Sequence, residues 1–267
     1  MTAEHRSPAY DPVRERAWHL SLWVAPEVSG WCVHERASGE VVALFTGKGD
    51  ALPHGSAMPL RPSSVSFAVL PEISTLVPES ALVPGSEMRH LKMVHGTLPT
   101  GLLRDEPIGA LGARCVYLHD ERTEHQLLAR FPHARSLPLQ AVLVQGALAR
   151  SGGGPVVVAH RTERRLDLAI ARDKRLLLSN TFHAVTEEDL LYYTLFAIER
   201  CGLRPENVAL RTGGPLLTDA EEALLARYVP DTAPMLDRAD SRFHGLGPLP
   251  GRIHRWAALI DQFACAS

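Results

Sequence analysis

The chain has 267 residues, 45% of them hydrophobic, which is enough for the core of one large domain or of two smaller ones. A formal net charge of −2 argues against a strong global attraction to nucleic acid or to an anionic membrane. No stretch approaches the roughly 20 apolar residues that span a bilayer, so no membrane span is predicted. The polar N-terminal tail, residues 1–16, does not resemble a signal peptide, and the four cysteines form no metal or redox motif. These features predict a cytoplasmic protein with reduced thiols.

Three short segments follow the N-terminal tail and predict an antiparallel meander. Residues 18–24, 30–35 and 41–45 are strand-like runs, and the segments between them are typical of turns. The same order recurs over residues 156–182, where three more apolar runs are separated by polar turns. This repeated order at a large offset predicts two related halves.

The region between the two meanders predicts a mixture of strands and helices. We assign a loop to 47–62, strands or extended segments to 65–70, 73–78, 113–118 and 134–137, and helices to 120–131 and 139–150. Residues 88–94 fit either a strand or a short helix, and the rest of 80–107 has no assignment.

Residues 151–155 read Ser-Gly-Gly-Gly-Pro and predict a flexible hinge between the halves. A phosphate-binding loop is the alternative for such a glycine run. Phosphate loops lead from a strand into a helix, so that helix N–H groups face the anion. Here the segment leads from a predicted helix into a predicted strand, which favours the hinge.

A long apolar helix is predicted after the second meander. Thr186 and Asp189 form a capping box at its start. Residues 190–201 are apolar on nearly every side and include Tyr192 and Phe196. A helix with so little polar surface is expected to be covered by other elements.

The remainder of the chain predicts one strand, one glycine turn and a second capped helix. The strand covers 207–212, the turn is Gly213-Gly214-Pro215, and the helix covers 219–228. A brief edge strand is expected over 235–236, and the rest of 230–267 has no firm assignment.

This order of elements, together with several local blocks, resembles the actin-like superfamily. The blocks are residues 178–182 (LSNTF), 186–193 (TEEDLLYY), 202–207 (GLRPEN), 65–67 (VSF) and 75–78 (TLVP). Within that superfamily the chain is similar to an uncharacterised bacterial family of pseudo-ATPase proteins. That family is related by fold to the cytoplasmic actin-like proteins of type IV pilus and type II secretion machines.

The resemblance implies an α/β fold of two ribonuclease-H-like halves, each a β-meander followed by alternating helices and strands. The first actin-like half would cover residues 17–150, the hinge 151–155 and the second half 156–267. Nucleotide-binding members of the superfamily close the two halves on the nucleotide.

Active members of the superfamily carry an Asp-x-Gly motif at the phosphate turns, where the carboxylate holds magnesium through water. The matching turns here, residues 24–30 and 160–165, lack this motif, and Glu27 is the only acid in the first of them. The third element, a strand that ends in Gly-Gly near the adenosine, is present over 210–214. The resemblance therefore implies a degenerate nucleotide site.

The candidate cofactor-binding residues are Thr212, Gly213 and Gly214 at the third element and Arg161 and Thr162 at the second. Glycines allow a close approach to a ligand, and guanidinium groups match phosphate oxygens. The alternatives are a tight strand-to-helix turn and a solvated hairpin tip. The primary expectation is no cofactor, with ATP as the one to test, and no catalytic residue or metal site is predicted.

Three tryptophans, Trp18, Trp23 and Trp31, lie on the predicted N-terminal meander. They either form an adhesive surface for a partner or pack beneath the helices that cover the sheet.

These observations lead to a non-catalytic actin-like scaffold or regulatory protein that binds a protein partner. The alternative is a kinase or ATPase with atypical phosphate motifs, in which Glu27, Asp167 and the Gly213-Gly214 turn act. A nucleic-acid binder is disfavoured by the charge balance. The partner's identity and the oligomeric state are not predicted.

Overall fold

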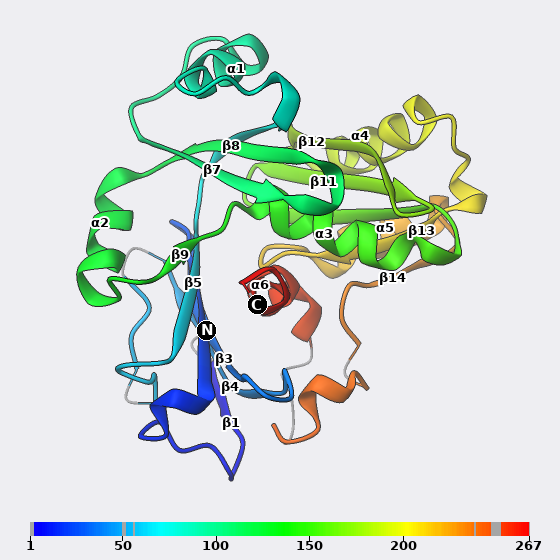
Figure 1. Cartoon of the computed structure of the whole chain (residues 1–267). Helices are drawn as coiled ribbons and strands as arrows, with labels where there is room; N and C mark the ends of the chain where they lie inside the picture. The colour runs from blue at the N-terminus through cyan, green and yellow to red at the C-terminus, as the bar shows by residue number, and fades with distance from the viewer. Residues whose placement is uncertain (1–2, 50–51, 56, 238, 247–251, 267) are drawn as a thin grey trace.

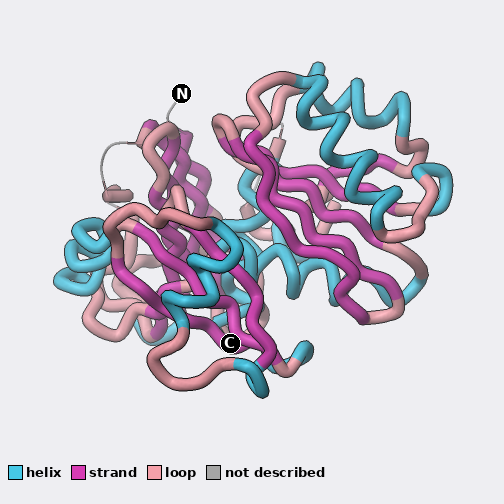
Figure 2. Tube along the Cα trace, turned by 90° about the horizontal axis from the view of Figure 1, so that it is seen from above, coloured by secondary structure: helices cyan, strands magenta, loops and turns pink. Residues whose placement is uncertain are grey.

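The computed structural model describes residues 3–49, 52–55, 57–237, 239–246 and 252–266. Within these residues the chain forms three β-sheets and six α-helices (Figure 1), which confirms the α/β class. The two large sheets are separate layers (Figure 2). None of the helices in these ranges combines the length and the apolar character that a membrane crossing requires.

The first sheet is built on the predicted N-terminal meander. Its strand order is β1-β4-β3-β2-β5-β9, with β1 (Ala3–Arg6), β2 (Trp18–Val24), β3 (Val28–Glu35), β4 (Val41–Lys48), β5 (Ser64–Val69) and β9 (Arg135–Ser136). Strands β2, β3 and β4 pair antiparallel, which confirms the meander. Strand β5 lies parallel to β2 and to β9, so these three strands end at the same edge of the sheet.

The second large sheet repeats this plan. Its order is β12-β11-β10-β13-β14, with β10 (Val156–Thr162), β11 (Arg165–Arg172), β12 (Arg175–His183), β13 (Ala209–Gly213) and β14 (Thr232–Pro234). Strands β10, β11 and β12 form the second meander as predicted, and β13 lies parallel to β10. The last strand pairs over 232–234 and not over 235–236, so the expected position of this edge strand is wrong by three residues.

The segment 80–107, most of which has no assignment from the sequence, supplies one strand of a small third sheet and the helix that packs on it. Its order is β6-β8-β7, with β6 (Ile73–Pro78), β7 (Leu102–Ile108) and β8 (Ala113–His119). Helix α1 (Glu87–His95) packs on this sheet through the buried Leu91, so the helical alternative for 88–94 is confirmed. Prolines and glycines flank α1 on both sides and its apolar face is short, so the sequence pattern does not distinguish this helix from a loop or a strand.

Two helices fill the space between the large sheets. Helix α3 (Leu139–Arg150) and helix α6 (Ala257–Ala266) share one apolar core with residues of β2 and β10, such as Trp23 and Val158. Helix α6 packs on β2, β3 and β5, so the end of the described chain covers the first sheet (Figure 1). The boundaries 17–150, 151–155 and 156–267 stay a prediction.

The remaining helices lie on the outer faces of the sheets. They are α2 (Glu121–Arg130), α4 (Glu187–Arg200) and α5 (Asp219–Tyr228). The capping box of Thr186 and Asp189 is present, and Thr218 and Glu221 form a second one.

All three tryptophans of the first sheet are buried. Trp18 and Trp23 are 1% exposed and Trp31 is fully enclosed, so packing is the correct alternative for these side chains. Helix α4 shows the opposite outcome, because Tyr192 is 60% and Phe196 41% exposed. The expectation that α4 is covered on every side is therefore wrong. Its inner face packs on the sheet, and its outer face is open.

A buried polar network joins α6 to the first sheet. His19 on β2 contacts the hydroxyl oxygens of Ser64 (2.9 Å) and Ser66 (3.1 Å) through its two ring nitrogens. The Ser66 hydroxyl donates to Oε1 of Gln262 on α6, and the Gln262 amide donates to the Leu22 carbonyl. These bonds satisfy polar groups that the docking of α6 removes from water.

We expect stability to fall below neutral pH because of this network. Burial, and secondarily Arg36, lowers the pKa of His19 to about 4. The unfolded side chain titrates near 6.5. The stabilising contribution is therefore complete above about pH 6.5 and is lost toward pH 4, by about 1.4 kcal/mol per pH unit. Urea denaturation at pH 7, 6 and 5 measures how the free energy of unfolding depends on pH. His19→Gln should reduce this dependence by about 1.4 kcal/mol per pH unit, the contribution of one titrating proton. Equal slopes in the two proteins would contradict the assignment.

Candidate functional site

The two hairpin turns that the resemblance assigns to phosphate line one small cavity. Its volume is about 200 Å³, and its walls are residues 25–27, 70–71 and 162–165. Thr162, at the end of β10, and Glu27, just after β2, therefore border the same cavity. Ligand pockets usually measure about 300–1,000 Å³. The cavity has room for a small group and not for a whole nucleotide.

Arg161, the candidate phosphate ligand, is fully engaged by protein groups. Its Nε donates to the Glu221 carboxylate at 2.9 Å, and its Nη1 donates to the Ala184 carbonyl at 2.8 Å. Both side chains of this ion pair are about 5% exposed. Its guanidinium group is therefore committed to α5 and to the loop before α4, and a phosphate would have to displace Glu221.

The glycine turn of the third element is closed by neighbouring atoms. A Cβ on Gly213 would lie 2.8 Å from Met235 Sδ and 2.9 Å from the His254 carbonyl. Gly214 has a φ of +112°, and a Cβ there would lie 2.2 Å from the Arg161 carbonyl oxygen. The Thr212 hydroxyl donates to Glu222. The turn at 160–165 and the glycine turn at 213–214 are thus in contact, but other protein groups occupy the space in front of the glycines.

A buried charged cluster lies at the inner end of the small cavity. Arg165 on β11 binds both carboxylate oxygens of Asp167 through Nε, at 2.9 and 2.8 Å. Its Nη1 also donates to the Glu72 carbonyl in the first half of the chain. The Thr181 hydroxyl donates to Asp167 at 2.6 Å. Asp167 is therefore paired with a cation and a hydroxyl, and it does not offer the open carboxylate that a magnesium ion needs.

Glu72 ties this cluster to α3. Its carboxylate accepts hydrogen bonds from the backbone N–H groups of Leu139 and Gln140, the first residues of that helix. Burial raises the pKa of Glu72, and the charge of Arg165 partly offsets this effect. The pair Arg165 and Asp167 has the two-residue spacing that places strand side chains on one face. No local pattern identifies Glu72, because it contacts Arg165 only through the tertiary fold.

Two buried aromatic side chains meet between the two large sheets. Trp23 of β2 and His160 of β10 lie with ring centroids 5.5 Å apart. Within the described part of the chain, Trp23 Nε1 and both ring nitrogens of His160 lack a hydrogen-bond partner. Burial lowers the pKa of His160 to about 4, so the ring is neutral at physiological pH.

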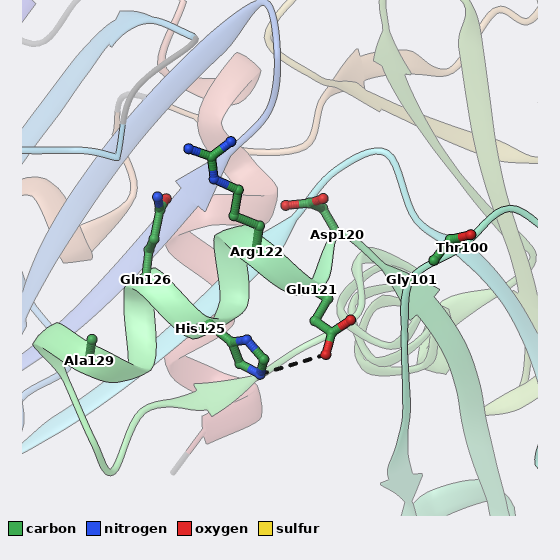
Figure 3. Close-up of a pocket in the computed structure, with 8 residues that line it drawn as sticks. All are labelled: Thr100, Gly101, Asp120, Glu121, Arg122, His125, Gln126 and Ala129. Atoms are coloured by element: carbon green, nitrogen blue, oxygen red, sulfur yellow. Dashed lines mark ion pairs between the residues drawn. The ribbon is translucent and has the colours of Figure 1, made fainter.

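A wider hollow of about 650 Å³ lies along α2 (Figure 3). His125 and Glu121 face each other there, but they are 3.9 Å apart and more than half exposed. Exposed pairs of this kind contribute little. Figure 3 shows Arg122 and Gln126 pointing away from that pair, so these four side chains do not converge on one point. Across the described ranges, no group of three or more His, Cys, Asp or Glu side chains could hold a metal ion.

Comparison with known proteins identifies the fold. A protein from Bacteroides thetaiotaomicron, described as having an actin-like ATPase fold and unknown function, is similar with a TM-score of 0.72 and 16% identity over 82% of this chain and 91% of that chain. The PilM–PilN type IV pilus biogenesis complex is similar with a TM-score of 0.47 and 13% identity, covering 93% and 99% of the two chains. The cytoplasmic domain of EpsL, from the type II secretion system of Vibrio cholerae, has a TM-score of 0.45 and 13% identity, covering 92% and 94%.

No curated protein matches the chain. A family model described as a protein of unknown function (DUF3822) matches residues 63–231, which is more than half of the sequence. The predicted resemblance to an uncharacterised actin-like family is thus confirmed. The chain belongs to the DUF3822 family and has the actin-like ATPase fold.

Proposed function

We propose that this protein works as a scaffold that binds a protein partner through the open face of its second half, and that it does not turn over a nucleotide. The observation that carries the proposal is a continuous row of four aromatic rings. Phe182 of β12 stacks on Tyr193 at 4.7 Å, Tyr193 contacts Tyr192 at 5.2 Å, and Tyr192 stacks on Phe196 at 5.9 Å. The last two rings are exposed. Aromatic side chains are enriched at interfaces and dominate their energetics.

The aromatic row begins at the free edge of a sheet. Strand β12 is the terminal strand of its sheet in the described part of the chain, and it contains no proline or acidic residue. An edge strand of nine residues can accept a further strand from another chain. Arg172, Lys174 and Arg175 surround the start of β12, with Asp173 as the only acid among them. We therefore propose an extended partner segment that carries apolar anchors and an acidic end.

The geometry of the phosphate turns supports a role without nucleotide turnover. The cavity between them has about 200 Å³, the Arg161 guanidinium is bound to Glu221, and Met235 and His254 stand against Gly213. The groups that would hold magnesium ATP are thus absent or already paired within the described residues. A cytoplasmic location is part of the same proposal, and the four free cysteines agree with it.

We expect Tyr192→Ser combined with Phe196→Ser to abolish partner binding while the fold is preserved. Each exposed ring could contribute about 2 kcal/mol or more as an interface anchor, so the double variant should lose at least 100-fold in affinity. A photoreactive phenylalanine at position 192 identifies the partner by crosslinking in the native host. The purified partner is then titrated against the native protein and the variant.

Tyr228→Ser is the matched control, because Tyr228 is a 48% exposed tyrosine on the neighbouring helix α5. It should leave the affinity unchanged. Equal affinity of the double variant and the native protein would contradict the proposed surface. Calorimetric titration with magnesium ATP should show no binding, and detectable ATP turnover would contradict the non-catalytic role.

A further inference from the structure

A third cavity lies on the opposite edge of the first sheet from the phosphate turns. It measures about 420 Å³, and residues 60–65, residues 130–135 and Ala266 line it. These segments lead into the parallel strands β5 and β9, whereas residues 25–27 and 70–71 of the small cavity follow the other ends of β2 and β5. Six residues of strand separate the two edges by about 20 Å. The cavity is therefore distinct from the site described above.

The lining of this cavity is basic. Arg61, Arg130, His133 and Arg135 contribute to it, and no aspartate or glutamate does. Arg135 is paired with Glu106. Among the described residues, neither Arg61 nor Arg130 has a carboxylate partner within ion-pair distance. The charges of Arg61 and Arg130 are thus not neutralised by a carboxylate, whereas that of Arg135 is.

Arg130 is the most informative of these cations. Its guanidinium carbon lies 5.3 Å from the centroid of the Phe131 ring, and its Nη1 donates to the Pro53 carbonyl at 3.3 Å. Partial burial lowers the pKa of Arg130, with no acid to offset the effect. A guanidinium group has five N–H donors in a fixed fork. With one described hydrogen bond, this exposed side chain keeps donors available for a ligand.

The same cavity has apolar walls. Val65 and Phe131 are buried at its base, and Leu60 is 72% exposed at its rim. An isolated inorganic anion would use the arginines but not these surfaces. A ligand with both an anionic and an apolar part would use all of them.

We infer that this cavity binds a small organic phosphate with an apolar group, the phosphate meeting Arg61 and Arg130 and the apolar group lying against Phe131 and Val65. Two unpaired guanidinium groups favour a dianion, and their forks match phosphate oxygens in a bidentate manner. The inference does not depend on the proposed protein partner, because the cavity and the aromatic row lie on different sheets.

Calorimetry with phenyl phosphate, inorganic phosphate and benzyl alcohol tests the site. Phenyl phosphate should bind at least 10-fold more tightly than inorganic phosphate, and benzyl alcohol should not bind measurably. Arg61→Gln with Arg130→Gln should weaken phenyl phosphate at least 30-fold. Arg122→Gln is the control, since Arg122 is exposed on the same helix as Arg130 but lines the other hollow.

Arg61→Gln alone separates an effect on binding from an effect on stability, because this substitution breaks no ion pair among the described residues. It should weaken phenyl phosphate several-fold without changing the thermal midpoint. Amide shifts of Val65 and Ala134 should follow the titration. Unchanged affinity in the double variant, or equal binding of benzyl alcohol, would overturn the inference. Sedimentation with phosphatidic acid vesicles should be negative; arginine-dependent binding there would overturn the assignment to a soluble ligand.

Discussion

Arg165→Met is expected to destabilise the protein by about 3 kcal/mol, because it leaves a buried carboxylate without its cation. The side chain of Arg165 is 13% exposed, and that of Asp167 only 4%. Burial alone would lower the pKa of Arg165, and the charge of Asp167 more than offsets this, so the guanidinium stays charged. Urea denaturation at pH 8 measures the loss of unfolding free energy.

Two comparisons separate this effect from a general loss of charge. Arg164→Met removes an exposed neighbour and should change stability by less than about 0.5 kcal/mol. Adding Asp167→Leu to Arg165→Met should recover part of the loss, since no unpaired charge is then buried at that position. If Arg165→Met matched Arg164→Met, the buried pair of Arg165 and Asp167 would not stabilise the fold as described.

Gly214→Ala should cost roughly 3 kcal/mol or more, or prevent folding altogether. The φ of +112° is unfavourable for alanine, and the new Cβ would meet the backbone of Arg161 at 2.2 to 2.8 Å. Neighbouring backbone cannot move away without breaking the pairing of β10 with β13. Thermal denaturation followed by circular dichroism checks the loss.

Gly154→Ala is the matched control for this prediction. Gly154 also has a positive φ, +142°, but a Cβ there would have no neighbour within 4 Å. It should cost only the backbone strain, about 1 to 2 kcal/mol. Similar losses at the two positions would show that the contact with Arg161 is not the cause.

The meanders and the helix caps could be predicted because each depends on residues that are close together in the sequence. Both meanders follow from short runs between turn residues, and the helix caps follow from threonine with an acid three residues later. The glycine turn at 213–214 was also found, because glycine is required by its backbone angle and close contacts.

The features that were missed depend on contacts distant in the sequence. Glu72 and Arg165 are 93 residues apart, and nothing near Glu72 shows that it will be buried. The composition of α4 predicted full burial, but apolarity alone does not say how many faces a fold covers. The sequence also does not predict the basic cavity, because Arg61 and Arg130 come together only when β5 and β9 pair.

Helix α6 makes the first sheet depend on residues that are synthesised long after its strands. Its Leu259 and Ile260 are buried in the core shared with β2, and Gln262 closes the hydrogen bonds of Ser66 and Leu22. On the ribosome, β2 would therefore expose an apolar face until Gln262, 240 residues after Leu22, had been added. A fragment cut at the predicted hinge would lack α6 and would keep that apolar face uncovered.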